Sequence, residues 1–123
     1  PLHFKKLRIE DLSGDVESGE FDTKVIVDYT LAGKPGTFDA VGNGPIDAVK
    51  RGLQLTFGMN IRVLDYEEHA LQNGSNAQAA AYIHMDAESG RVTYGVGVSS
   101  NITRASVRAM FSAVNRLELV KGV

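Results

Sequence analysis

The sequence is predicted to pass twice through the same succession of three strands and one helix. Alternating apolar residues indicate the strands, and apolar residues at helical spacing indicate the helices. The predicted strands are 7–9, 21–31 and 37–41 before a helix at 46–57, then 61–71, 77–85 and 92–98 before a helix at 102–117. Two such units, residues 3–58 and 61–118, predict an α+β fold with two helices packed on antiparallel sheets.

The two units can also be aligned with each other, at an offset of roughly 54–56 positions. The alignment pairs Leu7–Asp11 with Ile61–Asp65, Thr37–Phe38 with Thr93–Tyr94, and Ile46 with Ile102. A duplication of this kind brings pseudo-twofold symmetry, and such surfaces readily form symmetric dimers.

Alternation also assigns side chains to faces in the longer strands. One face of the second strand is predicted to hold Phe21, Thr23, Val25, Val27, Tyr29 and Leu31, and one face of the fifth to hold Ala77, Ala79, Ala81, Ile83 and Met85. Turns are expected at Ala32–Gly36, Gln72–Asn76 and Glu88–Arg91. Ser99 or Ser100 is expected to cap the last helix.

The stretch Gly42–Ala48 marks the change from a strand to a helix. Gly42 and Gly44 permit a close backbone approach or a positive φ, and Pro45 suits the first helical position. The free N–H groups of such a helix start can hold a carboxylate or a phosphate. A well-capped junction without a ligand explains the same residues, so this stretch alone leaves both interpretations open.

Composition limits the class of protein. With 123 residues the chain is expected to form one domain, and a net charge of −2 argues against a nucleic-acid binder. It has no cysteine, and no apolar run is long enough to cross a bilayer, so neither disulfides nor membrane insertion are expected. No signal peptide is recognised, which makes the cytoplasm the expected location. Because residue 1 is proline, we expect an excised domain.

No constellation of catalytic or metal-binding residues is evident. His3, His69 and His84 are dispersed, and Glu68–His69 fits a polar contact at a strand better than an acid–base pair. Gly42–Gly44 lacks the lysine and hydroxyl of a phosphate-binding loop. We therefore predict neither a catalytic residue nor a metal site in this chain.

Several segments resemble a known family, in the same order along the chain. They are Gly42–Ala48, Val63–Ala70, Asn76–Tyr82, Tyr94–Val98, Ile102–Ser106 and Ser112–Arg116. Together they resemble the C-terminal regulatory domain of alpha-isopropylmalate synthase over nearly the whole chain. Citramalate and homocitrate synthases are related families.

The resemblance implies an internally duplicated domain that binds L-leucine, the end product of the pathway, for feedback inhibition. It also implies a homodimer with the effector at the interface between two regulatory domains. The catalytic part of the family is a separate barrel with a divalent metal that condenses acetyl-CoA with 2-oxoisovalerate. That barrel is too large for 123 residues, so no active site and no cofactor are expected here.

The resemblance also implies the residues of the effector site. They are Gly42, Asn43, Gly44, Pro45, Ile46 and Ala48 at the first helix start, Val63, Tyr66 and Ala70, then Ala77, Ala79 and Val98. Gly74–Asn76 departs from the acidic residues that the family often has there, and this loop could change effector choice. Two alternatives remain: an isoleucine-binding domain of a citramalate synthase, and a small carboxylate-binding interaction module.

Overall fold

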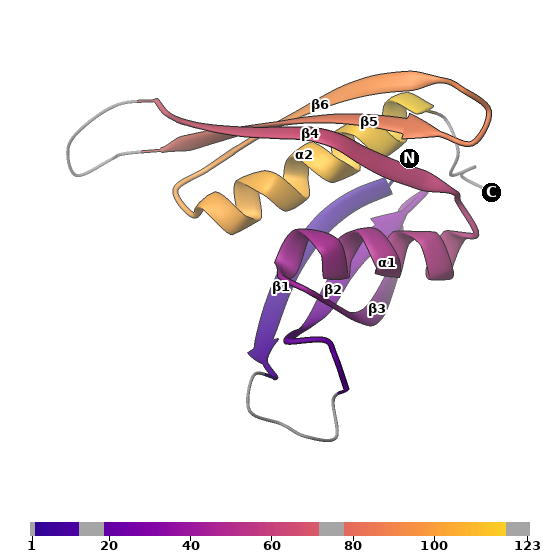
Figure 1. The fold of residues 1–123 in the computed structure, drawn as a ribbon, viewed down its shortest axis with the longest axis vertical. Helices are drawn as coiled ribbons and strands as arrows, with labels where there is room; N and C mark the ends of the chain where they lie inside the picture. Colours follow the sequence, from indigo (N-terminus) through magenta and orange to yellow (C-terminus); the bar gives the residue numbers. More distant parts are fainter. Residues whose placement is uncertain (1, 13–18, 72–77, 118–123) are drawn as a thin grey trace.

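The duplicated α+β fold is confirmed by a computed structural model, which describes residues 2–12, 19–71 and 78–117. Antiparallel strands form two separate sheets, in the orders β1-β2-β3 and β4-β5-β6, and one helix packs on each sheet (Figure 1). The elements are β1 (Leu2–Asp11), β2 (Thr23–Leu31), β3 (Lys34–Gly42), α1 (Pro45–Phe57), β4 (Ile61–Ala70), β5 (Ala79–Ala87), β6 (Val92–Ser99) and α2 (Ile102–Leu117).

The sequence prediction that pairs Leu7–Asp11 in the first unit with Ile61–Asp65 in the second is wrong. β1 carries an irregularity between Phe4 and Lys6, and β4 carries the same irregularity between Val63 and Asp65. The two strands also share one pattern of burial, beginning with a fully buried Leu2 and Ile61. These features align Leu2 with Ile61, so Leu7 corresponds to Tyr66 rather than to Ile61.

Three local predictions are also corrected. Phe21 precedes β2, and its ring lies 4.7 Å from the guanidinium carbon of Arg51. The first hairpin turn consists of only Ala32 and Gly33, both with positive φ, as the tightest hairpins require. The cap of α2 is Asn101, whose side chain accepts the N–H of Arg104. The predicted turn at 72–76 lies outside the described residues.

The two helices approach their sheets differently. On the first sheet, the ring of Phe38 in β3 fills the space above Gly52 of α1. On the second, Gly95 and Gly97 of β6 lie directly under the backbone of α2. The core between these layers consists mainly of aliphatic side chains, including Val25, Val27, Leu53, Ile83, Met85, Met110 and Val114.

Because the glycines of β6 face α2, the apolar side chains of that strand face outward. Val92, Tyr94, Val96 and Val98 are between 37% and 59% exposed, and Tyr82 of β5 lies beside Val96. Among the described residues, no helix is long and apolar enough to cross a membrane.

Candidate functional site

A hollow of about 310 Å³ lies where the beginnings of both helices meet β4. Its walls come from the start of α1, from the middle of β4 and from the first turns of α2. The lining residues are Asn43, Gly44, Pro45, Ile46, Asp47, Tyr66, Glu68, Ile102, Thr103 and Ser106. The hollow therefore joins the first unit of the fold to the second.

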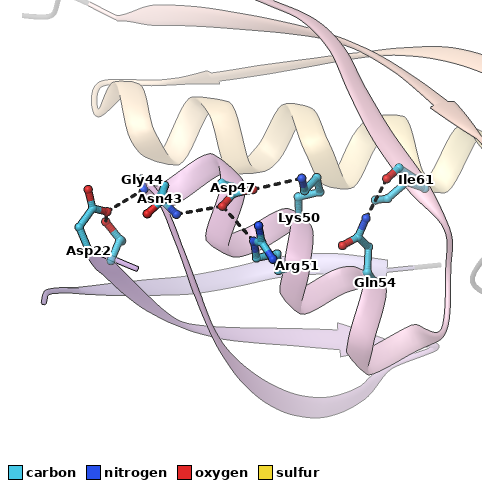
Figure 2. A network of polar contacts seen from close by, with 9 residues as sticks. Asp22, Asn43, Gly44, Asp47, Lys50, Arg51, Gln54 and Ile61 are labelled. Atoms are coloured by element: carbon cyan, nitrogen blue, oxygen red, sulfur yellow. Dashed lines mark hydrogen bonds and ion pairs between the residues drawn. The ribbon is translucent and has the colours of Figure 1, made fainter. Parts of the chain in front are cut away.

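Two carboxylates fix the backbone at the start of α1 (Figure 2). Asp22 accepts the N–H of Gly44 at 3.0 Å, and Asp47 accepts the N–H of Asn43 at 2.9 Å. Gly44 has a φ of 91°, a conformation that glycine adopts without strain. The first backbone bond of the helix runs from Ala48 N to Gly44 O, so the N–H groups of Ile46 and Asp47 remain for a ligand.

Charge around Asp47 favours the ionised carboxylate. Burial by itself raises the pKa of Asp47, but hydrogen bonds from Asn43, Arg51 and Lys50 outweigh it and lower the pKa from 3.8 to about 2. Arg51 Nε and Lys50 Nζ lie 3.0 and 3.1 Å from its oxygens. Gln54 of the same helix donates to Ile61 O at 2.9 Å, which ties α1 to β4.

Asp47→Asn should lower the free energy of unfolding at pH 7 by about 1 kcal/mol, a value that allows for solvent screening of these partly exposed charges. Because folding lowers the pKa, this stabilisation is present above pH 3.8 and is lost as the pH falls to about 2. Urea unfolding of the wild type and the variant at pH 7 and pH 2 measures this stabilisation. Asp39→Asn is the control, because Asp39 is exposed. If Asp47→Asn lowered the free energy of unfolding by as much at pH 2 as at pH 7, this account would be contradicted.

A chain of hydroxyl groups forms the opposite wall. Tyr66 Oη lies 2.5 Å from Glu68 Oε1 and 2.6 Å from Ser106 Oγ, and Ser106 donates to Ile102 O at 2.9 Å. Burial and the bond to Glu68 raise the pKa of Tyr66, so its phenol keeps its hydrogen at neutral pH. This wall connects β4 to the first turn of α2.

Five of the predicted effector residues line the hollow together: Asn43, Gly44, Pro45, Ile46 and Tyr66. Gly42 and Ala48 do not line it; a side chain at Gly42 would come within 2.6 Å of Ala48 N. Val63, Ala70 and Ala79 do not line the hollow, and Val98 points to the outer face of its sheet. Ala77 lies outside the described residues.

The sequence interpretation did not assign the other five lining residues to the site. These are Asp47, Glu68, Ile102, Thr103 and Ser106. The internal repeat carried the signal for three of them, because Ile102, Thr103 and Ser106 begin the helix that repeats α1. Only the packing of the two units brings that helix start to the same hollow.

The same pseudo-symmetry produces a second, smaller hollow of about 190 Å³. It is lined by Leu7, Ile9, Asn101, Thr103 and Arg104, where Leu7 and Ile9 correspond to Tyr66 and Glu68. The two helix starts differ in their capping. Asn101 accepts an N–H of its own helix, whereas Gly44 makes no side-chain cap.

Among the described residues, no three His, Asp or Glu side chains are grouped closely enough to hold a metal ion. The chain is a duplicated βββα domain with a hollow between its two helix starts. Residues 2–118 match the family model of the LeuA allosteric (dimerisation) domain, and the chain belongs to that family.

Curated relatives of the chain are named 2-isopropylmalate synthase. The protein of Thermobifida fusca is 46% identical over 102 residues, which cover 83% of this chain and 17% of the relative. That of Kineococcus radiotolerans is 51% identical over 90 residues (73% and 15%), and that of Mycobacterium ulcerans 40% over 116 residues (94% and 19%). The chain thus spans less than a fifth of the length of these relatives.

Proposed function

We propose that this chain is the regulatory domain through which a 2-isopropylmalate synthase binds L-leucine and is inhibited by it. The observation that carries the proposal is the hollow between the two helix starts, in a chain whose family is described as allosteric. Its volume of about 310 Å³ suits a small amino acid.

The chemistry of the walls fits an amino acid. The N–H groups of Ile46 and Asp47 precede the first backbone bond of α1 and can receive the carboxylate. Pro45, Ile46 and Ile102 give the hollow an apolar part for a branched aliphatic side chain. Asn43 can hydrogen-bond to either polar end of the ligand.

We further propose that the domain forms a homodimer and is joined to a cytoplasmic catalytic barrel, which holds the divalent metal and condenses acetyl-CoA with 2-oxoisovalerate. The family description as a dimerisation domain supports the first part, and the names of the relatives support the second. Leucine can inhibit such an enzyme only by binding one state more tightly, with a coupling of about 1–3 kcal/mol.

Calorimetric titration with L-leucine, L-isoleucine, L-lysine and D-leucine tests the proposal. We expect saturable binding that is selective for L-leucine, and a stabilisation of about 2.7 kcal/mol at a concentration 100 times the Kd. Selective binding of L-isoleucine would indicate the domain of a citramalate synthase. A folded protein that binds none of the four would contradict the effector role and favour an interaction module.

Sedimentation equilibrium of the same samples tests the dimer independently. We expect a mass twice that of one chain, 13.3 kDa, at micromolar concentration. A monomer with and without L-leucine would contradict the proposed homodimer while leaving the effector site open to its own test.

A further inference from the structure

The hydroxyl chain that forms one wall of the hollow lacks one hydrogen. Three short oxygen–oxygen distances follow one another, from Glu68 Oε1 to Tyr66 Oη, to Ser106 Oγ and to Ile102 O. A carboxylate and a carbonyl only accept, so the two hydroxyl groups must supply every hydrogen. When Tyr66 donates to Glu68 and Ser106 donates to Ile102, no hydrogen remains between Tyr66 and Ser106.

A donor brought by the ligand would remove this shortage. All four residues of the chain line the hollow, and Glu68 is exposed on β4. The opposite wall is the start of α1, whose free N–H groups suit a carboxylate. A ligand that spans the hollow therefore meets donors at one end and an acceptor at the other, which is the polarity of a zwitterionic amino acid.

We propose that Glu68 receives the α-ammonium group of the effector, an inference that rests on the effector function proposed above. Once the ammonium group donates to Glu68, the hydroxyl of Tyr66 is free to turn and donate to Ser106. The hydroxyl of Ser106 keeps its bond to Ile102 O, and the ammonium group, which donates to both Glu68 and Tyr66 Oη, takes the place of the direct hydrogen bond between those two residues. The ammonium group is thereby linked to the first turn of α2.

This arrangement selects for the amino group as well as for the side chain. A 2-oxo acid or a simple carboxylic acid of the same carbon skeleton has no N–H to give to Glu68. Such an acid leaves the negative charge of Glu68 with only the hydroxyl of Tyr66 as its partner and brings no cation to it. Glu68 therefore distinguishes the amino acid from its 2-oxo acid, which differs from it only at the α-carbon.

The experiment compares L-leucine with 4-methylpentanoate, which has the same skeleton without the amino group. Both ligands are titrated calorimetrically into the wild type, Glu68→Gln and Glu67→Gln. Glu67 is the matched control because it is adjacent on β4 and faces outward, with a side chain that is 64% exposed. The free energies of urea unfolding of the ligand-free proteins show that the variants are folded.

In the wild type and in Glu67→Gln we expect L-leucine to bind about 10- to 100-fold more tightly than 4-methylpentanoate, the range of a hydrogen bond between charged groups. In Glu68→Gln this preference should fall to about threefold or less, mainly through weaker binding of L-leucine.

A Glu68→Gln protein that kept the full preference would overturn the role of Glu68 and leave the effector function intact. If Glu67→Gln and Glu68→Gln lost this preference equally, the role of Glu68 would be overturned as well. Both losses would then reflect the removal of a negative charge from the protein and not a contact between Glu68 and the ligand. A wild type that bound no L-leucine would instead refute the effector function, and with it this assignment.

Discussion

Gly97→Ala should destabilise the domain by about 3 kcal/mol, the upper part of the range for overpacked sites. A methyl group at Gly97 would overlap the carbonyl oxygen of Ala105 and lie 2.6 Å from Ala109 N. Both atoms belong to the backbone of α2, so a side-chain rotation cannot relieve the overlap. The helix would have to move away from β6, and the packing of its buried side chains would be lost.

The free energy of unfolding in urea measures this effect, and Val96→Ala is the control. Val96 is the neighbour of Gly97 in the strand, but it points to the outer face and is 43% exposed. Its replacement removes a strand-favouring residue without opening the core, and should cost less than about 1 kcal/mol. Similar losses in the two variants would show that α2 does not pack as closely on β6 as the structure indicates.

Thr103→Trp should weaken L-leucine binding by at least about 100-fold, equivalent to about 2.7 kcal/mol. Thr103 lies in the first turn of α2 at the wall of the larger hollow and is partly exposed. The indole can occupy the space that the proposed effector needs without entering the core. The unfolding free energy of the ligand-free protein should therefore stay within about 1 kcal/mol of the wild type.

The control is Arg104→Trp, which places the same indole one position further along α2. Arg104 is exposed and lines only the smaller hollow, whereas Thr103 lines both hollows. Calorimetry should therefore show wild-type affinity for L-leucine in Arg104→Trp. Loss of binding in both variants would point to the smaller hollow as the effector site. Binding retained in both variants would exclude both hollows as the effector site.

The start of α1 could be located from the sequence because its signals are local. Pro45 at the first helical position, Gly58 at the end and the preceding strand all lie within a few residues of one another, and the structure places α1 at Pro45–Phe57. Asn101 was missed as the cap of α2 because Ser99 and Ser100 are equally suitable residue types. Ser99 instead accepts the N–H of Asn101.

The alignment of β1 with β4 failed for a different reason. Leu7–Asp11 and Ile61–Asp65 are similar in their alternation, and alternation repeats every two residues. The shifted pairing differs from the true one by five residues, and it still fits the pattern because the irregularity between Val63 and Asp65 places Ile61 and Tyr66 on the same face of β4. The irregularities at Phe4–Lys6 and Val63–Asp65 fix the true alignment, and they are features of strand pairing rather than of residue type.

The sequence by itself determined the order of the elements, their division into two βββα units and the strand-to-helix junction beside the hollow. Only the tertiary structure decided which face of β6 receives α2, since alternation separates two faces without saying which one is covered. The glycine face is covered because a helix can approach Gly95 and Gly97 closely. The tertiary structure also brings Ile46, Tyr66 and Ser106 together around one hollow. This could not be read from the sequence, because it depends on how two units that are distant in the chain pack together.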